Sequence, residues 1–385
     1  MSRLWKNVKK LLIHRIYLPA VFLFARFRRR DQNKIVLVSD RHPALEPNLA
    51  AIKRELDARG YTTVAYVNFQ QGLLNRLRDY TRFTIDYAAC GAVLLEDYFL
   101  PAYANRPRRG TQLIQLWHAC GAFKKWGYSC IGKTWGMSAG EARLSRAHRG
   151  YTGAITSSEA IREKYAEAYH CDISIIHPTG IPRTDEFFDP SFQQSARSKF
   201  FSLHPEMKGK KLVLYAPTFR GADADLAHND KNAFDLPLLH ERLGDHYGLV
   251  LKLHPFVSEA VEIPASCTGF ACDVSSEMQI NEMLSLADIC VSDYSSLIFE
   301  FSLMDRPMVF YAYDLQAYIA ERDFYYDYAS MVPGRIAETC EELAAYILSA
   351  DADFDRELMA AFRKKFMGAC DGCSTERFMQ QFFPN

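Results

Sequence analysis

The chain has 385 residues, 46 of them basic and 46 acidic, and 49% of its residues are hydrophobic. A chain of this length is expected to form two domains, each with its own core, and the composition is that of a soluble α/β protein. Outside the N-terminal segment, basic residues do not interleave with aromatic ones, so we expect no nucleic-acid partner.

Residues 1–30 differ in charge from the rest of the chain. They hold nine Lys or Arg and no acidic residue, which leaves 37 basic and 46 acidic residues, a net charge of −9, in residues 31–385. Their apolar residues are interrupted by His14, Arg15 and Pro19 and are too few for a membrane span of about 20 residues. We predict a basic amphipathic segment that contacts an anionic membrane surface, with a helix docked on the protein itself as the alternative.

The ten cysteines are scattered along the chain. Only Cys370 and Cys373 have metal-ligand spacing, and a zinc site would need further cysteines or histidines nearby in sequence. We therefore expect no metal site and a reducing, cytoplasmic environment.

After the N-terminal segment, apolar runs that suit buried strands alternate with amphipathic helical stretches. This alternation predicts a parallel sheet covered on both faces, and we assign residues 31–187 to a first Rossmann-like domain. The predicted strands are 34–39, 62–67, 92–95, 111–116, 153–156 and 172–176, and the predicted helices include 47–59 and 158–169.

A second series follows the polar stretch 185–210, and we assign residues 188–385 to a second Rossmann-like domain. The loop 221–231 is polar enough to serve as a lid, and strand-end loops of the two domains would surround one cleft. The predicted strands are 211–215, 248–253, 289–292 and 308–311, with a helix over 277–287. The fold class is therefore α/β.

Polar residues follow several predicted strands abruptly. His118 follows the strand 111–116, and a histidine held at a cleft can take a proton from a hydroxyl group. Arg183, in the segment 180–185, is a candidate substrate contact that could also simply pair with Asp185.

Two further strand ends carry candidate phosphate contacts. Thr218 and Arg220 follow the strand 211–215, and the planar guanidinium of arginine suits a diphosphate. Lys252 and His254 are two residues apart at the end of the strand 248–253, so they would share a face. Either side chain could neutralise charge on a transferring phosphoryl group.

The segment Asp293–Ser296 joins the strand 289–292 to a helix that we expect to begin at Ser295 and Ser296. Unpaired N–H groups at such a helix start favour a phosphate, whereas serines that only cap the helix are the alternative. No Gly-x-Gly-x-x-Gly motif is present, which argues against the commonest dinucleotide sites.

In order, these motifs resemble the CDP-glycerol glycerophosphotransferase family of teichoic-acid and capsule synthesis. The likeness runs from about Ile35 to the C-terminus. The matching segments are 117–118, 180–185, 215–220, 253–255, 292–296, 306–307, 313–315, 324–328 and 333–334.

The resemblance implies a GT-B architecture of two Rossmann-like domains. The first domain would meet a lipid-linked (undecaprenyl-diphosphate) saccharide acceptor at the cytoplasmic membrane face, as a peripheral protein, and the second would hold CDP-glycerol or another CDP-alditol. By the same resemblance His118 is the catalytic base, and His254 stabilises the phosphate. Carried over likewise, the remaining donor contacts are Arg220, Ser295 and Ser296 on the diphosphate, with Thr218 and Asp293 lining its pocket.

The implied reaction is transfer of glycerol phosphate to an acceptor hydroxyl with release of CMP. Fixed cationic donors can stabilise the developing charge, so we expect no cofactor and no absolute metal requirement. The length of the chain is like that of the short, priming members. A CDP-ribitol-dependent transferase and a GT-B nucleotide-sugar glycosyltransferase are alternatives, as is a membrane-bound binding protein with a decayed site.

Overall fold

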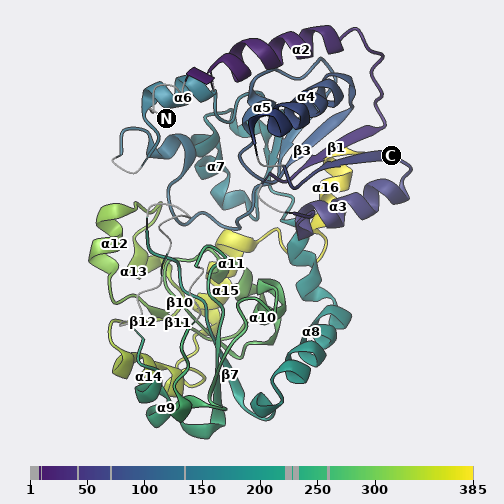
Figure 1. The fold of residues 1–385 in the computed structure, drawn as a ribbon. Helices are drawn as coiled ribbons and strands as arrows, with labels where there is room; N and C mark the ends of the chain where they lie inside the picture. Colours follow the sequence, from purple (N-terminus) through teal and green to yellow (C-terminus); the bar gives the residue numbers. More distant parts are fainter. Residues whose placement is uncertain are drawn as a thin grey trace. The chain divides into compact units, whose positions relative to one another are not determined.

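In a computed structural model, the described residues are 8–9, 11–40, 43–69, 72–133, 136–221, 228, 234–257 and 261–384. They form two compact α/β units, each built on a parallel sheet flanked by helices (Figure 1). Unit 1 comprises residues 1–119, 125–185 and 369–385, and unit 2 comprises residues 120–124 and 186–368.

The sheet of unit 1 has the strand order β2-β1-β3-β4-β5-β6, and all neighbouring strands are parallel. All residues of β3 and all but the first of β1 are buried, as expected for strands covered on both faces. The order reverses between β1 and β3, which places the loops after these strands at a topological switch point. The strands are β1 (Lys34–Val38), β2 (Thr62–Tyr66), β3 (Ala92–Leu95), β4 (Gln112–Gln115), β5 (Gly153–Ile155) and β6 (Ile176–His177).

The helices of unit 1 are α2 (Leu18–Ala25), α3 (Pro47–Ala58), α4 (Leu73–Ala89), α5 (Leu100–Tyr103), α6 (Ala139–Ser145), α7 (Arg162–Tyr169) and α16 (Ser374–Phe382). A π-helical turn, Ile13–Tyr17, precedes α2. Helix α2 packs along α4, and its Phe22 ring lies 5.3 Å from the ring of Tyr87. The packing of α2 on α4 agrees with the alternative in which this segment is a helix docked on the protein itself. Part of the predicted membrane segment, residues 1–7 and 10, lies outside the described residues.

Unit 2 has the strand order β12-β11-β10-β7-β8-β9, again all parallel. Counted from β7, this is the order 3-2-1-4-5-6 of a dinucleotide-binding Rossmann sheet, and its switch point lies between β7 and β10. The strands are β7 (Lys211–Tyr215), β8 (Tyr247–Leu251), β9 (Ala271–Asp273), β10 (Ile289–Ser292), β11 (Met308–Tyr311) and β12 (Arg335–Ala337). The expected α/β class with two Rossmann-like sheets is confirmed.

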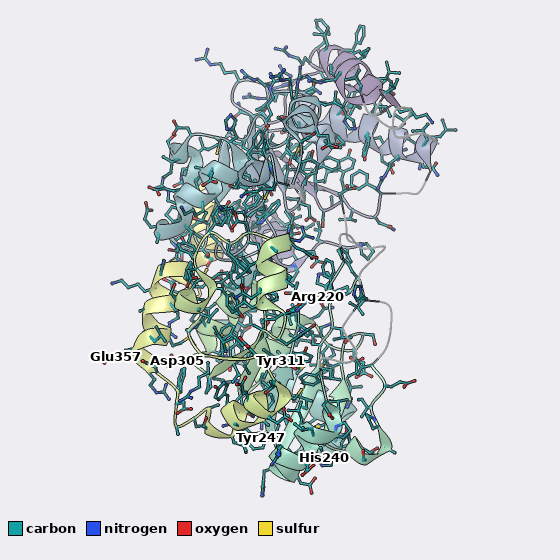
Figure 2. All side chains as sticks on the ribbon, turned by 90° about the vertical axis from the view of Figure 1, so that its left-hand side faces the viewer. Arg220, His240, Tyr247, Asp305, Tyr311 and Glu357 are labelled. Atoms are coloured by element: carbon teal, nitrogen blue, oxygen red, sulfur yellow. The ribbon has the colours of Figure 1, made fainter. Side chains whose placement is uncertain are left out.

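Helices cover both faces of this sheet, and α9 and α14 lie side by side (Figure 1). The core beneath them includes Leu239, Leu343 and the strand residue Tyr311, which is labelled in Figure 2. The helices are α8 (Pro190–Leu203), α9 (Leu236–Leu243), α10 (Ile280–Leu286), α11 (Leu297–Phe301), α12 (Leu315–Glu321), α13 (Tyr328–Met331), α14 (Cys340–Ser349) and α15 (Arg356–Met367).

Some predicted elements differ from the structure. Residues 172–176 were expected as a strand, but Ile173–Ile175 form a 3-10 turn capped by Asp172, and β6 is only Ile176–His177. The stretch 185–210 contains the 14-residue helix α8, which Asp189 caps through the N–H of Ser191. The three-residue strands β9 and β12 were not predicted.

The C-terminal residues 369–385 belong to unit 1, which differs from the contiguous second domain 188–385 expected from the sequence. The carboxylate of Asp185 accepts the N–H groups of Ser374 (2.9 Å) and Thr375 (2.7 Å) at the start of α16. Phe378 and Phe382 of α16 are buried. An amphipathic helix shows in sequence that it has an apolar face but not which sheet that face covers.

Candidate active site

In unit 1, His118 follows β4 and Asp97 follows the neighbouring strand β3, so both lie at the carboxyl edge of the sheet. Nδ1 of His118 is 2.9 Å from Oδ1 of Asp97, whose side chain is only 3% exposed, whereas that of His118 is 41% exposed. Because a carboxylate only accepts hydrogen bonds, Nδ1 carries the proton and Nε2 of the neutral ring is left as the base. The arrangement can accept a proton from a hydroxyl group.

The backbone around His118 is fixed by two amide side chains. Trp117 has a positive φ of 62°, an uncommon conformation for a large side chain. Its N–H donates to Oε1 of Gln115 (3.0 Å), and its carbonyl accepts from Nδ2 of Asn48 (3.3 Å). Asn48 also accepts the N–H of Arg183 (2.9 Å). Asn48 therefore ties the segment 180–185 to Trp117.

Glu96, the neighbour of Asp97, is almost fully buried. Burial raises the pKa of Glu96 to about 8, although the positive charge of Arg183 opposes this rise. The guanidinium of Arg183 is thus close enough to Glu96, the neighbour of Asp97, for its charge to lower the pKa of that carboxyl group. The sequence pattern did not lead us to Glu96 and Asp97, although two acids directly after an apolar strand are the same signal that identified His118.

In unit 2, Asp293 bridges the two strands at the switch point. It follows β10, and its Oδ1 accepts the N–H of Thr218, which follows β7, at 2.8 Å and that of its own neighbour Tyr294 at 2.6 Å. The structure therefore brings together Thr218 and Asp293 at the edge where Rossmann sheets bind ligands.

Arg220, which is labelled in Figure 2, is held by two carboxylates. Its Nη1 donates to Asp293 (2.9 Å), while Nε and Nη2 donate to the two carboxylate oxygens of Asp314 (2.7 and 2.9 Å). The guanidinium also lies over the rings of Tyr294 and Tyr318, each 5.3 Å away. Each of its three nitrogens thus has a carboxylate acceptor, and Nη1 has a second acceptor in the carbonyl of Thr218.

His254 lies after β8 and packs against the rings of Phe219 and Phe256, which also contact each other. Burial, together with the positive charges of Lys124 and Lys252, lowers the pKa of His254 to about 4, so the ring is neutral at pH 7. Nδ1 accepts the N–H of Phe256 (3.2 Å), which leaves the proton on Nε2 as a donor. His254 is therefore suited to donate a hydrogen bond to an anion that two lysines also attract.

Lys252 lies one residue beyond β8, which ends two residues earlier than predicted. Its Nζ donates to the carbonyl of Ser275 at 2.6 Å, and burial lowers its pKa. Lys124, a residue of the segment 120–124, donates to the hydroxyl of Tyr318 at 3.0 Å. From the sequence alone, Lys124 is either an anion contact or part of a solvated face.

Ser295 and Ser296 precede α11, which begins at Leu297 and has only five residues. The expected helix start at Ser295 and Ser296 is therefore wrong by one to two residues, and so short a helix has little dipole to offer. At the start of this described helix the side chain of Ser296 accepts no capping hydrogen bond, whereas Oγ of Ser295 accepts the N–H of Leu297 at 3.5 Å, so the capping alternative is supported for Ser295 only. Most of the expected lid, 222–227 and 229–231, lies outside the described residues.

Two motifs of other enzyme classes occur in unit 1 without their structural setting. The residues 127–134 have phosphate-loop spacing, but Gly127–Cys130 form a 3-10 turn rather than the end of a strand. The residues 136–140 read Gly-x-Ser-x-Gly, but Ser138 caps α6 in a capping box with Glu141. Neither motif supports the function usually associated with it.

Within the described residues, no group of three or more His, Cys, Asp or Glu side chains is arranged to hold a metal ion. Among the helices that the structure describes, none combines the length and apolar character needed to cross a bilayer.

The two parallel six-stranded sheets, with polar residues at their carboxyl edges, define an α/β protein of two Rossmann-like units. The fold is similar to that of the wall teichoic acid polymerase TagF, with a TM-score of 0.77 and 20% identity over 98% of this chain and 95% of that one. It is also similar to a UDP-GlcNAc 2-epimerase from Neisseria meningitidis, with a TM-score of 0.55 and 12% identity over 91% of this chain and 100% of that one.

The chain belongs to the CDP-Glycerol:Poly(glycerophosphate) glycerophosphotransferase family, whose model matches residues 20–383. The family expected from the sequence motifs is thereby confirmed, and with it a place among the transferases of teichoic acid synthesis.

Three curated relatives show how the similarity is distributed. A teichoic acid poly(ribitol-phosphate) polymerase of Bacillus spizizenii is 36% identical over 355 residues, which cover 91% of this chain but 56% of the relative. The teichoic acid ribitol-phosphate primase of the same organism is 35% identical over 90% of both chains. Its glycerol-phosphate primase is 31% identical over 63% of this chain and 61% of the relative.

Proposed function

We propose that this chain transfers an alditol phosphate from a CDP-alditol to a hydroxyl group of a lipid-linked saccharide, and releases CMP. The observation that carries the proposal is the pair of His118 and Asp97 at the end of β3 and β4. Nε2 of His118 would take the proton of the acceptor hydroxyl, and the oxygen would attack the phosphorus that bears the alditol. The bond from this phosphorus to the CMP oxygen breaks, and CMP leaves with the electron pair.

Unit 2 is proposed to hold the donor. The Nε2–H group of His254 would donate to a diphosphate oxygen, and Lys124 and Lys252 would offset its charge. Thr218, Ser295 and Ser296 are proposed to line the same site. For Arg220 the hydrogen bonds favour a positioning role, in which it holds Asp293 and Asp314 and so shapes the loops of the switch point.

The donor alditol is proposed to be ribitol, with glycerol, the expectation from the sequence, as the second candidate. Relatives named for ribitol phosphate are 33% to 36% identical to this chain. Relatives named for glycerol phosphate are 26% to 31% identical. The ribitol-phosphate primase, which this chain spans almost fully, supports a short transferase of that type.

The test is to incubate the purified chain with CDP-ribitol, CDP-glycerol and UDP-sugars, each with and without a short-chain lipid-linked saccharide. We expect acceptor-dependent CMP release from a CDP-alditol, and its loss in His118→Ala. Nucleotide release from UDP-sugars alone would show a glycosyltransferase instead. A folded His118→Ala variant with wild-type turnover would refute the role of the base.

We also propose that the reaction has no absolute metal requirement, because Lys124, Lys252 and His254 supply fixed donors around the proposed diphosphate site. Turnover should survive an excess of EDTA. Restoration of lost turnover by a divalent cation would contradict this part of the proposal.

A further inference from the structure

Unit 1 contains a pocket of about 460 Å³ beside Trp117. Its walls come from the π-helical turn before α2, the loop after β3, the segment after β4 and helix α6. The volume is within the range of roughly 300 to 1,000 Å³ of small-molecule sites. The lining includes His14, Tyr98, Trp117, Trp126, Glu141 and Leu144.

The lining is aromatic and nearly free of positive charge. Among its described members are two tryptophans and a tyrosine, and neither lysine nor arginine is found there. The one carboxylate, that of Glu141, would repel a phosphate. A neutral molecule with apolar faces suits such a pocket, because aromatic walls bind those faces and a few polar groups fix the orientation.

The polar groups of the pocket can form hydrogen bonds with the hydroxyl groups of a ligand. Glu141 can accept hydrogen bonds, and the imidazole of His14 lies in the wall. His148, also in the wall, is buried, and this burial lowers its pKa to about 3, so its ring is neutral, with Nδ1 3.1 Å from the hydroxyl of Tyr151. A carboxylate acceptor and imidazole groups beside aromatic rings suit the hydroxyl groups and apolar faces of a saccharide.

The pocket adjoins the proposed base. The ring of Trp117 stacks on that of Trp126 and also contacts the ring of His118 at a tilt of 31°, with centroids 4.3 Å apart in each case. A molecule in the pocket that touches Trp117 therefore contacts a ring that packs directly against the residue that would deprotonate the acceptor. The π-helical turn that carries His14 is a second indication, since π-helical turns are rare and often occur at functional sites.

We propose that this pocket binds the neutral saccharide terminus of the acceptor. The inference rests on the proposed function and deepens it, because it identifies the acceptor end as a sugar rather than an alditol-phosphate chain. The chain would then add the first alditol phosphate to a saccharide, since an elongating enzyme must place a phosphate-bearing alditol beside its base. A pocket without lysine or arginine among its described residues is poorly suited to that.

The experiment measures direct binding to the full chain by calorimetry, without donor. The probes are N,N′-diacetylchitobiose, ribitol 5-phosphate and octyl phosphate, which represent a neutral disaccharide, an alditol phosphate and a lipid chain. We expect only the disaccharide to bind. Glu141→Gln, which keeps the capping box, should lower the affinity for the disaccharide about tenfold, and Trp126→Leu should lower it further. Arg143→Ala, an exposed change on the same helix, is the matched control.

The outcomes separate the pocket from the reaction. Failure of the disaccharide to bind, or binding that Glu141→Gln and Trp126→Leu leave unchanged, overturns the inference. So does Trp126-dependent binding of ribitol 5-phosphate or octyl phosphate. If the disaccharide binds as expected but no CDP-alditol releases CMP in its assay, the saccharide pocket stands and the proposed function fails.

Discussion

Asp97 and His118 form a hydrogen-bonding pair across neighbouring strands, with Oδ1 of the acid 2.9 Å from Nδ1 of the histidine. The pair is only possible because β3 and β4 are adjacent and parallel, so their ends meet at the same edge of the sheet. The acid is buried and the histidine is half exposed, which leaves the other ring nitrogen open to a substrate.

Replacing Asp97 with Asn should lower kcat by about 10²- to 10⁴-fold, because the amide no longer holds the proton on Nδ1. The affinity for the CDP-alditol should not change, since the donor is proposed to bind unit 2. Turnover and donor binding measured on the same preparation test this, with circular dichroism as the folding control. Near wild-type turnover in a folded Asp97→Asn variant would show that the pair is structural.

Replacing Arg220 with Ala should lower the free energy of unfolding by about 3 kcal/mol, because Asp293 and Asp314 would lose the cation that pairs with them. Urea unfolding measures this, and Arg220→Lys should lose less. A residue that only contacts the diphosphate would weaken donor binding and leave stability unchanged. That result would contradict the positioning role.

The stability of unit 2 should depend on His254 in acid. Its folded pKa of about 4 lies below the ordinary value of 6.5, so its contribution is present above pH 6.5 and is lost as the pH falls through about 4. CMP should raise this pKa, because its phosphate offsets the charges of Lys124 and Lys252. The NMR titration of the His254 ring, assigned with His254→Gln, measures both. A midpoint that CMP does not move would place the phosphate elsewhere.

The segment 120–124 should tolerate little change at Gly121. Gly121 has a φ of 65°, and a Cβ atom on this residue would lie 2.3 Å from the ring of Phe299. We expect Gly121→Ala to cost about 1 to 3 kcal/mol more than Gly132→Ala, which has a φ of 84° but no atom within 4 Å of the new Cβ. Thermal unfolding of the two variants isolates the steric part, and equal losses would contradict it.

Membrane contact by residues 1–30 remains a prediction. Deleting the segment would also uncover the face against which Leu18 and Phe22 are buried, so point changes are sharper. Phe24 and Phe27 are 74% and 86% exposed, and their joint replacement by Ser should weaken binding to vesicles with anionic lipid. Leu348→Ser, an exposed change in unit 2, is the control. Unchanged vesicle binding in the double variant would refute the prediction.

The sequence by itself determined the α/β class, because its buried strands are continuous apolar runs. Ala92–Leu95, Lys211–Tyr215 and Ile289–Ser292 were predicted with the bounds that the structure gives them. It also determined His118 and Asp293 as strand-end candidates, since a polar residue soon after such a run lies at the edge of the sheet where ligands bind. The family followed from the order of these motifs along the chain.

Only the tertiary structure decided which residues act on each other. Asp97 and His118 are 21 positions apart in sequence, and Arg220 is 94 positions from Asp314, so strand order alone brings each pair together. Asp185 and α16 also meet only in the fold, where a side chain of the 3-10 helical segment Pro182–Phe188 caps a helix from the far end of the chain. Local patterns record burial and turns, whereas pairing depends on the order of strands in the sheet, which no single segment contains.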